Sequence, residues 1–259
     1  GYNKHGAEWM MRHNAPLSIL AKLSAPILRK LPASKNTKIG NITRQLVKLG
    51  HGAQLSNAER YIRWCSILDE EEVCQLLSRS VQQQLHVEKL KQDNLKYANS
   101  IQSNDFNEIL LADMQLILPG DMLYKVDMMS MANSLEVRSP LLDYTLVDYA
   151  FQLPSHFKID RKFKKKIIQD TFRSYLPSEL YNRPKMGFEI PLLQWFRKDF
   201  YSYIFENLLE EKFIEQQGLI SFPEIQRIKE KLMSDNPGNI QATIWALVVF
   251  KKKNKKYFT

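Results

Sequence analysis

Residues 105–120, DFNEILLADMQLILPG, contain the clearest fold signal in the chain. Apolar and polar side chains recur over 105–118 with the period of an α-helix, so one face of that helix is apolar. Pro119 and Gly120 come next. Proline lacks the amide hydrogen that a helix needs, so this pair predicts that the helix ends there. The segment therefore predicts an amphipathic helix that buries one face.

The same period extends through most of the chain. Only 9 glycines occur among 259 residues, and no segment longer than 136–139 is typical of a strand. No internal repeat or linker is present. We therefore predict a mainly α fold and one helical domain over 1–259. The expected helices are 15–31, 42–49, 57–68, 69–78, 81–97, 105–118, 121–133, 144–153, 164–175, 199–213, 222–233 and 240–252, with an aromatic helix near Trp195 and Phe196.

Composition excludes several classes of protein. The longest apolar run, 244–250, is far shorter than the roughly 20 residues that span a membrane, and no signal peptide is present. Cys65 and Cys74 lie nine residues apart, a spacing that fits neither a disulfide framework nor a zinc site, so a cytoplasmic location is expected. The first residue is Gly1 rather than methionine, so we expect a piece of a longer or processed protein.

The chain is basic, with a formal net charge of +9 and lysine runs at 161–166 and 251–256. Such a charge suits nucleic acid, anionic membrane or a phosphate-bearing substrate. No nucleic-acid recognition motif, phosphate loop or zinc motif is present. The five histidines show no metal-ligand spacing and are expected at the surface or at helix ends. From the residues alone, the chain is a basic helical domain.

One segment concentrates charge, SLEVRSPLLD at 134–143. It places Glu136, Arg138 and Asp143 around Pro140 on a segment expected to be partly buried, where charges are costly unless they are paired. They either form an internal ion pair that holds the turn or belong to a ligand site. Asp143 also suits the N-cap of the helix that follows. The methionines of the preceding MMSM, 128–131, are expected to pack in the core.

Three blocks carry a family resemblance. LPGDMLYKVDMMSMANSLEVRSPLLD, KKKIIQDTFRSYLP and NRPKMGFEIPLLQWF follow one another between 118 and 197. Their order and spacing resemble the C-terminal synthetase domain of glutamine-hydrolysing asparagine synthetases, and the opening Gly-Tyr-Asn is similar to the end of that family's pyrophosphate loop. The resemblance is weak over 1–104, specific over 105–200 and followed by further helices over 201–259.

This resemblance implies the helical C-terminal part of an α/β adenine-nucleotide alpha-hydrolase-like (ATP pyrophosphatase) domain, with its parallel sheet largely absent from the chain. It also implies a ligase that uses ATP and Mg²⁺ to adenylate the side-chain carboxylate of aspartate. Ammonia from glutamine then gives asparagine, and AMP and pyrophosphate are released. The glutaminase domain and the ATP loops are missing, so the chain alone is expected to be inactive.

The expected partners are the small-molecule substrates, the missing N-terminal domains and a second copy of the chain in a homo-oligomer, with no nucleic acid and no membrane. Two alternatives stay open. One is a related synthetase that amidates or cyclises another carboxylate, in a sugar acid, a peptide or a β-lactam precursor. The other is a non-catalytic basic helical module for interaction.

The resemblance assigns roles to individual residues. Lys165 stands twelve residues before Pro177, as the family's α-phosphate lysine does, and is expected to stabilise the transition state. On a helix, Lys164 and Lys166 would point about 100° to either side of it. The residues expected to contact ATP or substrate are Tyr2, Lys125, Asp127, Glu136, Arg138, Asp143, Arg183 and Lys185. For the last two, fixing their loop is the alternative, and for Lys125 and Asp127 it is helix packing.

Overall fold

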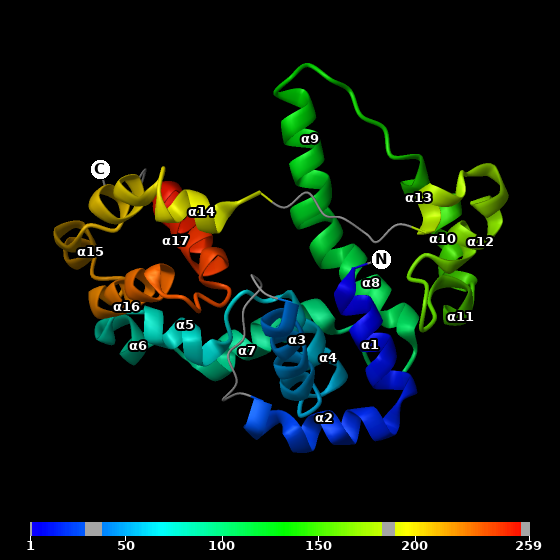
Figure 1. The fold of residues 1–259 in the computed structure, drawn as a ribbon, viewed down its shortest axis with the longest axis horizontal. Helices are drawn as coiled ribbons and strands as arrows, with labels where there is room; N and C mark the ends of the chain where they lie inside the picture. Colours follow the sequence, from blue (N-terminus) through cyan, green and yellow to red (C-terminus); the bar gives the residue numbers. More distant parts are fainter. Residues whose placement is uncertain (1, 29–37, 183–189, 255–259) are drawn as a thin grey trace. The chain divides into compact units, whose positions relative to one another are not determined.

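Helices form all the regular structure in the described ranges, which are residues 2–28, 38–182 and 190–254 of a computed structural model (Figure 1). Within those ranges there is no β-strand, and one isolated antiparallel bridge joins Leu77 to Ile220. The prediction of a mainly α chain is therefore confirmed.

The chain divides into two groups of helices, called unit 1 and unit 2 below. Unit 1 consists of Gly1–Leu23, Leu49–Cys65 and Gln92–Lys185. Unit 2 consists of Ser24–Lys48, Ser66–Lys91 and Met186–Thr259. Residues of both units occur in α2 (Ala15–Leu28), α3 (Lys38–Gly52) and α7 (Val87–Leu95). The single domain over 1–259 stays a prediction.

Unit 1 holds the first two predicted family blocks, and most of the third, from Met186 on, belongs to unit 2. The remaining elements of unit 1 are α1 (Asn3–His13), α4 (Asn57–Cys65), η1 (Lys96–Ala98), α8 (Phe106–Ile117), η2 (Leu118–Leu123), α9 (Tyr124–Met131), η3 (Pro140–Leu142), α10 (Tyr144–Gln152), α11 (Ser155–Lys158), α12 (Lys166–Phe172), η4 (Arg173–Tyr175) and α13 (Ser178–Asn182). A hydrophobic core joins α4, η1 and α8 through Tyr61, Ala98, Ile101, Ile109 and Ala112.

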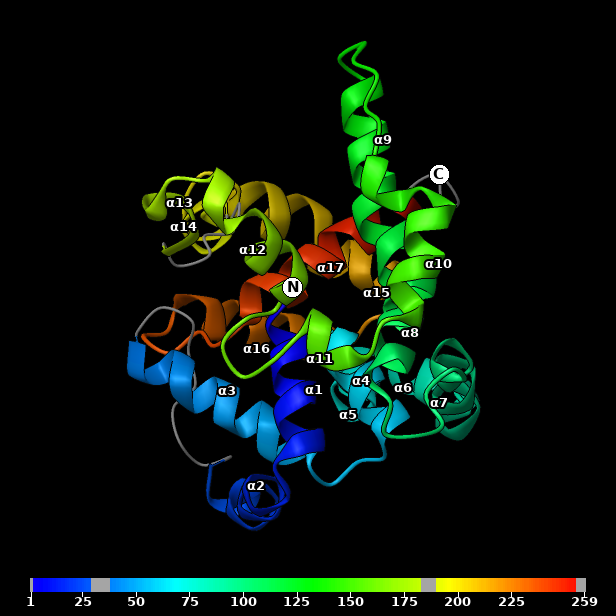
Figure 2. The same cartoon turned by 90° about the vertical axis from the view of Figure 1, so that its right-hand side faces the viewer.

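The predicted helix over 105–118 does not end at Pro119 and Gly120, so its predicted end was wrong. It continues through η2, a π-helical turn, into α9. A π-helical turn is wider than an α-helical turn, and such turns let a helix absorb a disruption without stopping. Figures 1 and 2 show α8, η2 and α9 as one rod, with α9 projecting away from the other helices of unit 1.

Unit 2 has a larger apolar core. Its elements are α5 (Glu70–Leu76), α6 (Arg79–Gln84), α14 (Leu192–Arg197), η5 (Tyr203–Leu208), α15 (Glu211–Gln217), α16 (Phe222–Met233) and α17 (Ile240–Asn254). The period of α16 buries Ile225, Ile228 and Leu232 on one face. Helix α15 ends at Gly218, whose φ of 62° is the left-handed conformation that glycine adopts without strain.

Side-chain caps set several helix boundaries. At the start of α4, Ser56 and Glu59 form the reciprocal bonds of a capping box, as their spacing predicts. The predicted single helix over 81–97 is wrong. The Ser78 hydroxyl caps α6, and Leu85 then adopts an extended conformation that ends it before α7 begins.

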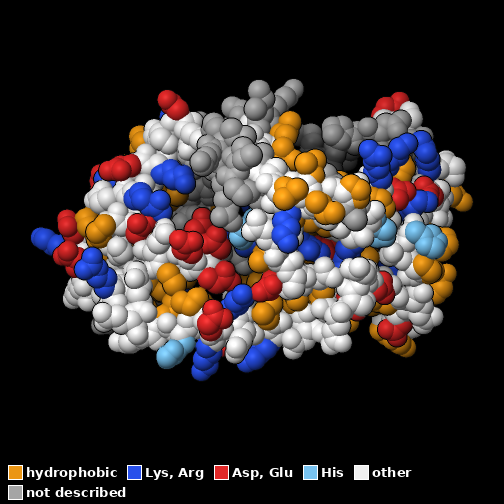
Figure 3. All heavy atoms as spheres, turned by 90° about the horizontal axis from the view of Figure 1, so that it is seen from below, with side chains coloured by type: hydrophobic (Ala, Val, Ile, Leu, Met, Phe, Trp, Pro, Cys, Tyr) orange, Lys and Arg blue, Asp and Glu red, His pale blue; other side chains and the backbone are white. Residues whose placement is uncertain are grey.

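Hydrophobic side chains also reach the surface. Figure 3 shows hydrophobic side chains among basic and acidic ones on the face that it draws. In the family blocks, Met128, Met129 and Met131 are 46%, 60% and 60% exposed, so the expectation that they pack in the core was wrong. A projecting helix offers few neighbours to cover its side chains. The first family block therefore presents an apolar surface.

Candidate functional site

The first turn of α1 lies at the centre of the candidate site in unit 1. Tyr2 precedes this turn and borders a cavity of about 260 Å³ between α8, η2, α10 and α11. Its ring lies edge-on to His5, with ring centroids 5.8 Å apart. Burial, together with the negative charges of Asp121 and Asp113, raises the pKa of the Tyr2 phenol. Tyr2 therefore stays protonated and can donate a hydrogen bond.

Next to the first turn of α1, the Asp113 carboxylate of α8 contacts three side chains. His5 Nε2 lies 3.0 Å from Oδ2, and the Tyr61 hydroxyl donates to Oδ1 at 3.0 Å. Lys4 forms a short ion pair with the same carboxylate and also contacts the Cys65 sulfur at 3.4 Å. Lys4, His5, Tyr61, Cys65 and Asp113, the Asp113 cluster, thus fix α1 to α4 and α8. His5 lies at a helix end, which is one of the two positions expected for the histidines, but it is only 5% exposed and so is not at the surface.

A second buried group of charges lies one turn further along α1. Arg60 donates from Nε and Nη2 to both carboxylate oxygens of Glu8, at 2.9 and 2.7 Å. Arg12 donates from Nε to Glu8 at 2.7 Å. The Glu8 and Arg12 side chains are each 1% exposed. Such a bidentate, buried arrangement holds two helices in one relative orientation.

The Asp113 cluster predicts a specific acid sensitivity. Burial alone would raise the pKa of Asp113, but the bonds from His5 and Lys4 outweigh it and lower this pKa from 3.8 to about 2. A carboxyl whose pKa is lower in the folded state stabilises the fold above its unfolded pKa. That stabilisation is lost as the pH falls through the folded pKa. We expect a loss of about 2 kcal/mol between pH 4 and 2.

Chemical unfolding measured at several pH values checks this expectation, with Asp113→Asn as the comparison. His5 contributes at higher pH, because burial lowers its pKa from 6.5. The variant should be less stable at neutral pH, and its stability should change less between pH 4 and 2. A variant whose stability falls as steeply as that of the unmodified chain in this interval would contradict the assignment.

The three lysines at the start of α12 have different surroundings. Lys164 donates to Asn3 Oδ1 at 2.6 Å, and Lys166 pairs with Asp170 at 3.2 Å. In the described part of the chain, the Lys165 ammonium makes neither a hydrogen bond nor an ion pair, and its side chain is exposed. Helix α12 begins at Lys166, and Lys165 is its N-cap with φ −140°. The predicted helix over 164–175 therefore starts two residues later than expected, as α12 followed by η4, and the 100° argument, which placed Lys164 and Lys165 on that helix, was wrong.

Lys125 and Asp127 lie on the projecting helix α9. Lys125 lies 3.7 Å from Asp121, one turn earlier, and both side chains are more than half exposed. Asp127 borders a cavity of about 400 Å³ that Val137 and Ser139 also line. The structure thus brings α9 and the returning segment 134–139 together around one cavity.

The charged residues of SLEVRSPLLD are exposed, which corrects the expectation of a partly buried network. The side chains of Glu136 and Arg138 are 69% and 87% exposed, and they form an ion pair with each other. Asp143 accepts a hydrogen bond from the Thr145 amide at 2.9 Å and caps α10. These charges incur little desolvation cost because the segment projects into solvent. Arg183 and Lys185 lie outside the described residues.

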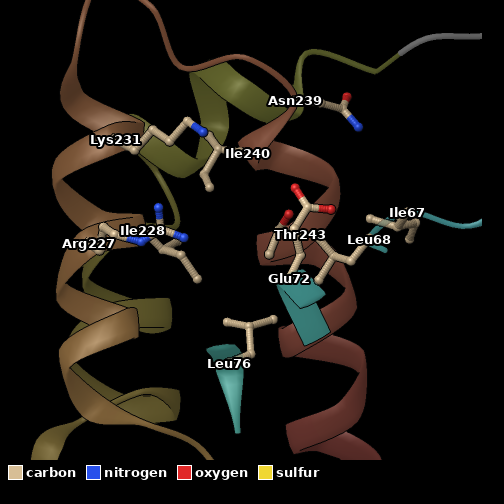
Figure 4. A pocket seen from close by; sticks show the side chains of 10 residues that line it. All are labelled: Ile67, Leu68, Glu72, Leu76, Arg227, Ile228, Lys231, Asn239, Ile240 and Thr243. Carbon is tan, nitrogen blue, oxygen red and sulfur yellow. The ribbon is translucent and has the colours of Figure 1, made fainter. Parts of the chain in front are cut away.

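Unit 2 contains a separate cavity of about 110 Å³ between α5, α16 and α17. Figure 4 shows Arg227 and Lys231 extending from α16 toward α17, with the Glu72 carboxylate of α5 facing them. Arg227 is already paired with Glu224 at 2.8 Å. No residue predicted for the site lines this cavity, so unit 1 holds the candidate site.

In the described ranges, no three His, Cys, Asp or Glu side chains converge as metal ligands. The donor set of these ranges therefore does not by itself fit a Mg²⁺ site. No helix in the described part of the chain is long and apolar enough to cross a membrane.

Known proteins match this chain along most of its length. The family model described as Asparagine synthase matches residues 1–252. "Asparagine synthetase [glutamine-hydrolyzing] 1" of Bacillus subtilis is 27% identical over 154 residues, which are 60% of this chain and 24% of that protein. A Mycobacterium bovis protein, also named for glutamine-hydrolysing asparagine synthetase, is 40% identical over 80 residues, 31% of this chain and 12% of its own.

A more distant relative, "Amidase chyE" of Penicillium rubens, is 26% identical over 128 residues, which are 47% of this chain and 19% of that protein. No solved structure matches. The relatives named as asparagine synthetases indicate a ligase-type family of enzymes. The chain belongs to the asparagine synthase family. It spans about a quarter of the length of the Bacillus relative.

Proposed function

We propose that the chain is the helical part of an ATP-dependent amidotransferase that makes asparagine. In this reaction an aspartate side-chain carboxylate oxygen bonds to the α-phosphorus of ATP, and pyrophosphate leaves. Ammonia derived from glutamine then attacks the acyl carbon, and AMP leaves. Both steps develop negative charge on phosphate oxygens, which a positioned cation stabilises.

The observation that carries this proposal is the position of Lys165. Its neighbours Lys164 and Lys166 are held by Asn3 and Asp170, while its own ammonium is exposed and makes no bond within the described ranges. A lysine ammonium is a compact charge with three donors, suited to phosphate oxygens. We assign Lys165 to the α-phosphate.

Tyr2 is the second residue of the proposed site. It stands one residue before Asn3, which holds Lys164, so Tyr2 and the turn bearing Lys165 lie at the same end of α1. The phenol can donate to a phosphate or ribose oxygen, because its pKa is raised. Mg²⁺, when bound, would supply positive charge that offsets the charge of the phosphates, and no residue of the described ranges is assigned to hold it.

The remaining predicted residues are proposed to contribute from the projecting part of unit 1 and the following loop. Arg138 presents an exposed guanidinium that could bind a carboxylate through two parallel bonds, in exchange for its pairing with Glu136. Asp143 serves as a helix cap and would act by orienting that segment. Lys125, Asp127, Arg183 and Lys185 stay predicted contacts to ATP or substrate.

The exposed apolar surface supports the proposed partners. Patches larger than a few hundred Å² are unusual on monomers and mark interaction sites. Between residues 124 and 175, unit 1 exposes Tyr124, Met129, Leu135, Leu141, Tyr144, Tyr149, Phe172 and Tyr175. We propose that the rest of a synthetase, bearing the ATP loops and the glutaminase domain, covers this surface in the cytoplasm. A homo-oligomer is the alternative.

The test is an assay of product formation. A complete synthetase that carries this chain is expected to convert aspartate, ATP and ammonia to asparagine, AMP and pyrophosphate. The 259-residue chain alone is expected to release no pyrophosphate. Formation of ADP, or amidation of another carboxylate but not aspartate, would contradict the proposed reaction. Turnover by the chain alone would contradict the need for the missing parts.

A further inference from the structure

The turn between α11 and α12 has a built geometry that neither the family blocks nor the proposed reaction explains. Asp160 Oδ1 accepts hydrogen bonds from the amides of Lys162 and Phe163, each at 2.7 Å. The Asp160 amide in turn donates to the Phe163 carbonyl oxygen at 2.9 Å. The neighbouring Ile159 is 2% exposed and anchors the turn to the protein. These three hydrogen bonds therefore fix the backbone of residues 160–163, which directly precede Lys164.

Lys164 then reaches across to α1. Its ammonium donates to Asn3 Oδ1 at 2.6 Å, a contact between residues 161 positions apart in the sequence. Its stem lies against Gly6, because a Cβ built on Gly6 would stand 3.1 Å from Lys164 Cε. A side chain at that position would have to displace the lysine stem. The absence of a side chain at Gly6 thus provides the space that the Lys164 side chain occupies.

We propose that Lys164 is a positioning residue that fixes the turn bearing Lys165 against the first turn of α1. This inference rests on the proposed function for its effect on the reaction. Lys165 follows the anchored residue directly and precedes α12, so its backbone is held on both sides while its ammonium stays available. Phosphate stabilisation requires such a placement, since a displacement of about 1 Å can cost 10²-fold in rate.

A structural role alone is a weaker explanation of this contact. The bond joins a partly buried lysine to an exposed asparagine, and bonds of that kind add little to stability. Its removal should therefore leave the protein folded. Removal of the bond should instead make the turn that bears Lys165 more mobile. A purely stabilising bond would change the free energy of unfolding, whereas a positioning bond changes the mobility of this turn in the folded protein.

The first arm of the test measures the turn itself, in a complete synthetase that carries this chain. Lys164→Met keeps the stem but removes the donor, and Asn3→Ala removes the acceptor. Each is expected to speed hydrogen exchange of the Lys162 and Phe163 amides about tenfold. The double variant should add little, because both changes break the bond between Lys164 and Asn3. Lys162→Met is the matched control, and unchanged exchange in Lys164→Met would overturn the proposal.

The second arm measures the reaction. Lys164→Met and Asn3→Ala are expected to lower kcat for adenylation about tenfold with little change in the KM for ATP, because positioning acts on the transition state. Lys164→Arg keeps a donor and should retain most of the rate. Gly6→Ala favours the helix by propensity but crowds the lysine stem, so it should lower kcat without lowering stability.

The outcomes separate the two proposals. Faster exchange without a change in kcat would overturn the positioning role and leave the proposed function intact. Loss of kcat in Gly6→Ala only in proportion to lost stability would also overturn it. If the unmodified synthetase forms no acyl-adenylate, the proposed function fails and so does the effect on catalysis. The exchange arm then still decides whether Lys164 holds the turn.

Discussion

Replacing Lys165 by alanine in a complete synthetase is expected to lower the rate of adenylation by roughly 10²-fold or more. The ammonium is exposed and makes no bond within the described ranges, so its removal breaks no contact that holds the fold. The loss should appear in kcat more than in the KM for ATP, because the contact strengthens as charge develops. Single-turnover measurement of acyl-adenylate formation checks the expectation.

Lys166→Ala is the matched control for this prediction. Its ammonium pairs with Asp170 on the same helix, an exposed i,i+4 pair of small energetic value. Lys164 is unsuitable as a control, because it contacts Asn3. In the proposed enzyme glutamine hydrolysis belongs to another domain, so it should survive in all variants. Equal losses for Lys165→Ala and Lys166→Ala would indicate a diffuse basic patch and remove the assignment of Lys165.

The largest expected effect on stability comes from Glu8. Glu8→Gln removes the charge that two buried guanidinium groups share, those of Arg12 and Arg60. Breaking a buried pair from one side costs about 3–5 kcal/mol, because the remaining charges stay desolvated without compensation. The loss should appear as a lower free energy of unfolding in urea, followed by far-ultraviolet circular dichroism.

Glu136→Gln provides the contrast. It also removes a carboxylate from a pair with an arginine, but both side chains of that pair are largely exposed. Its cost should stay below about 1 kcal/mol. If the two glutamine variants lose similar stability, the burial of the Glu8 group does not determine its energetic role.

Local signals in the sequence predicted much of the fold. The period of apolar residues located α8 and α16, and short-range polar spacing predicted the Ser56 box and the Asp143 cap. These features depend on residues within one or two turns of each other. The π-helical turn at Pro119 was missed, because the tertiary structure decides whether a helix breaks or widens there.

The candidate site was only partly predictable. Lys165 followed from a family spacing, but the Asp113 cluster joins residues from α1, α4 and α8 that lie as far as 109 positions apart. No pattern along the sequence links such residues. Helix α1 itself was not predicted, although the i,i+4 spacing of Glu8 and Arg12 was a usable signal. In the sequence alone, the charged residues of α1 are also typical of a solvent-exposed segment, because their buried partners lie far away along the chain.

The rod formed by α8, η2 and α9 has a mechanical consequence. Its α8 end is clamped, because Asp113 is tied to Lys4, His5 and Tyr61, while its α9 end stands free of that clamp. Regular helices resist bending, whereas a π-helical turn with proline and glycine yields more readily. A load applied to α9 would therefore be absorbed at η2. We therefore expect any bend of this rod to occur at η2 rather than at the contacts of Asp113.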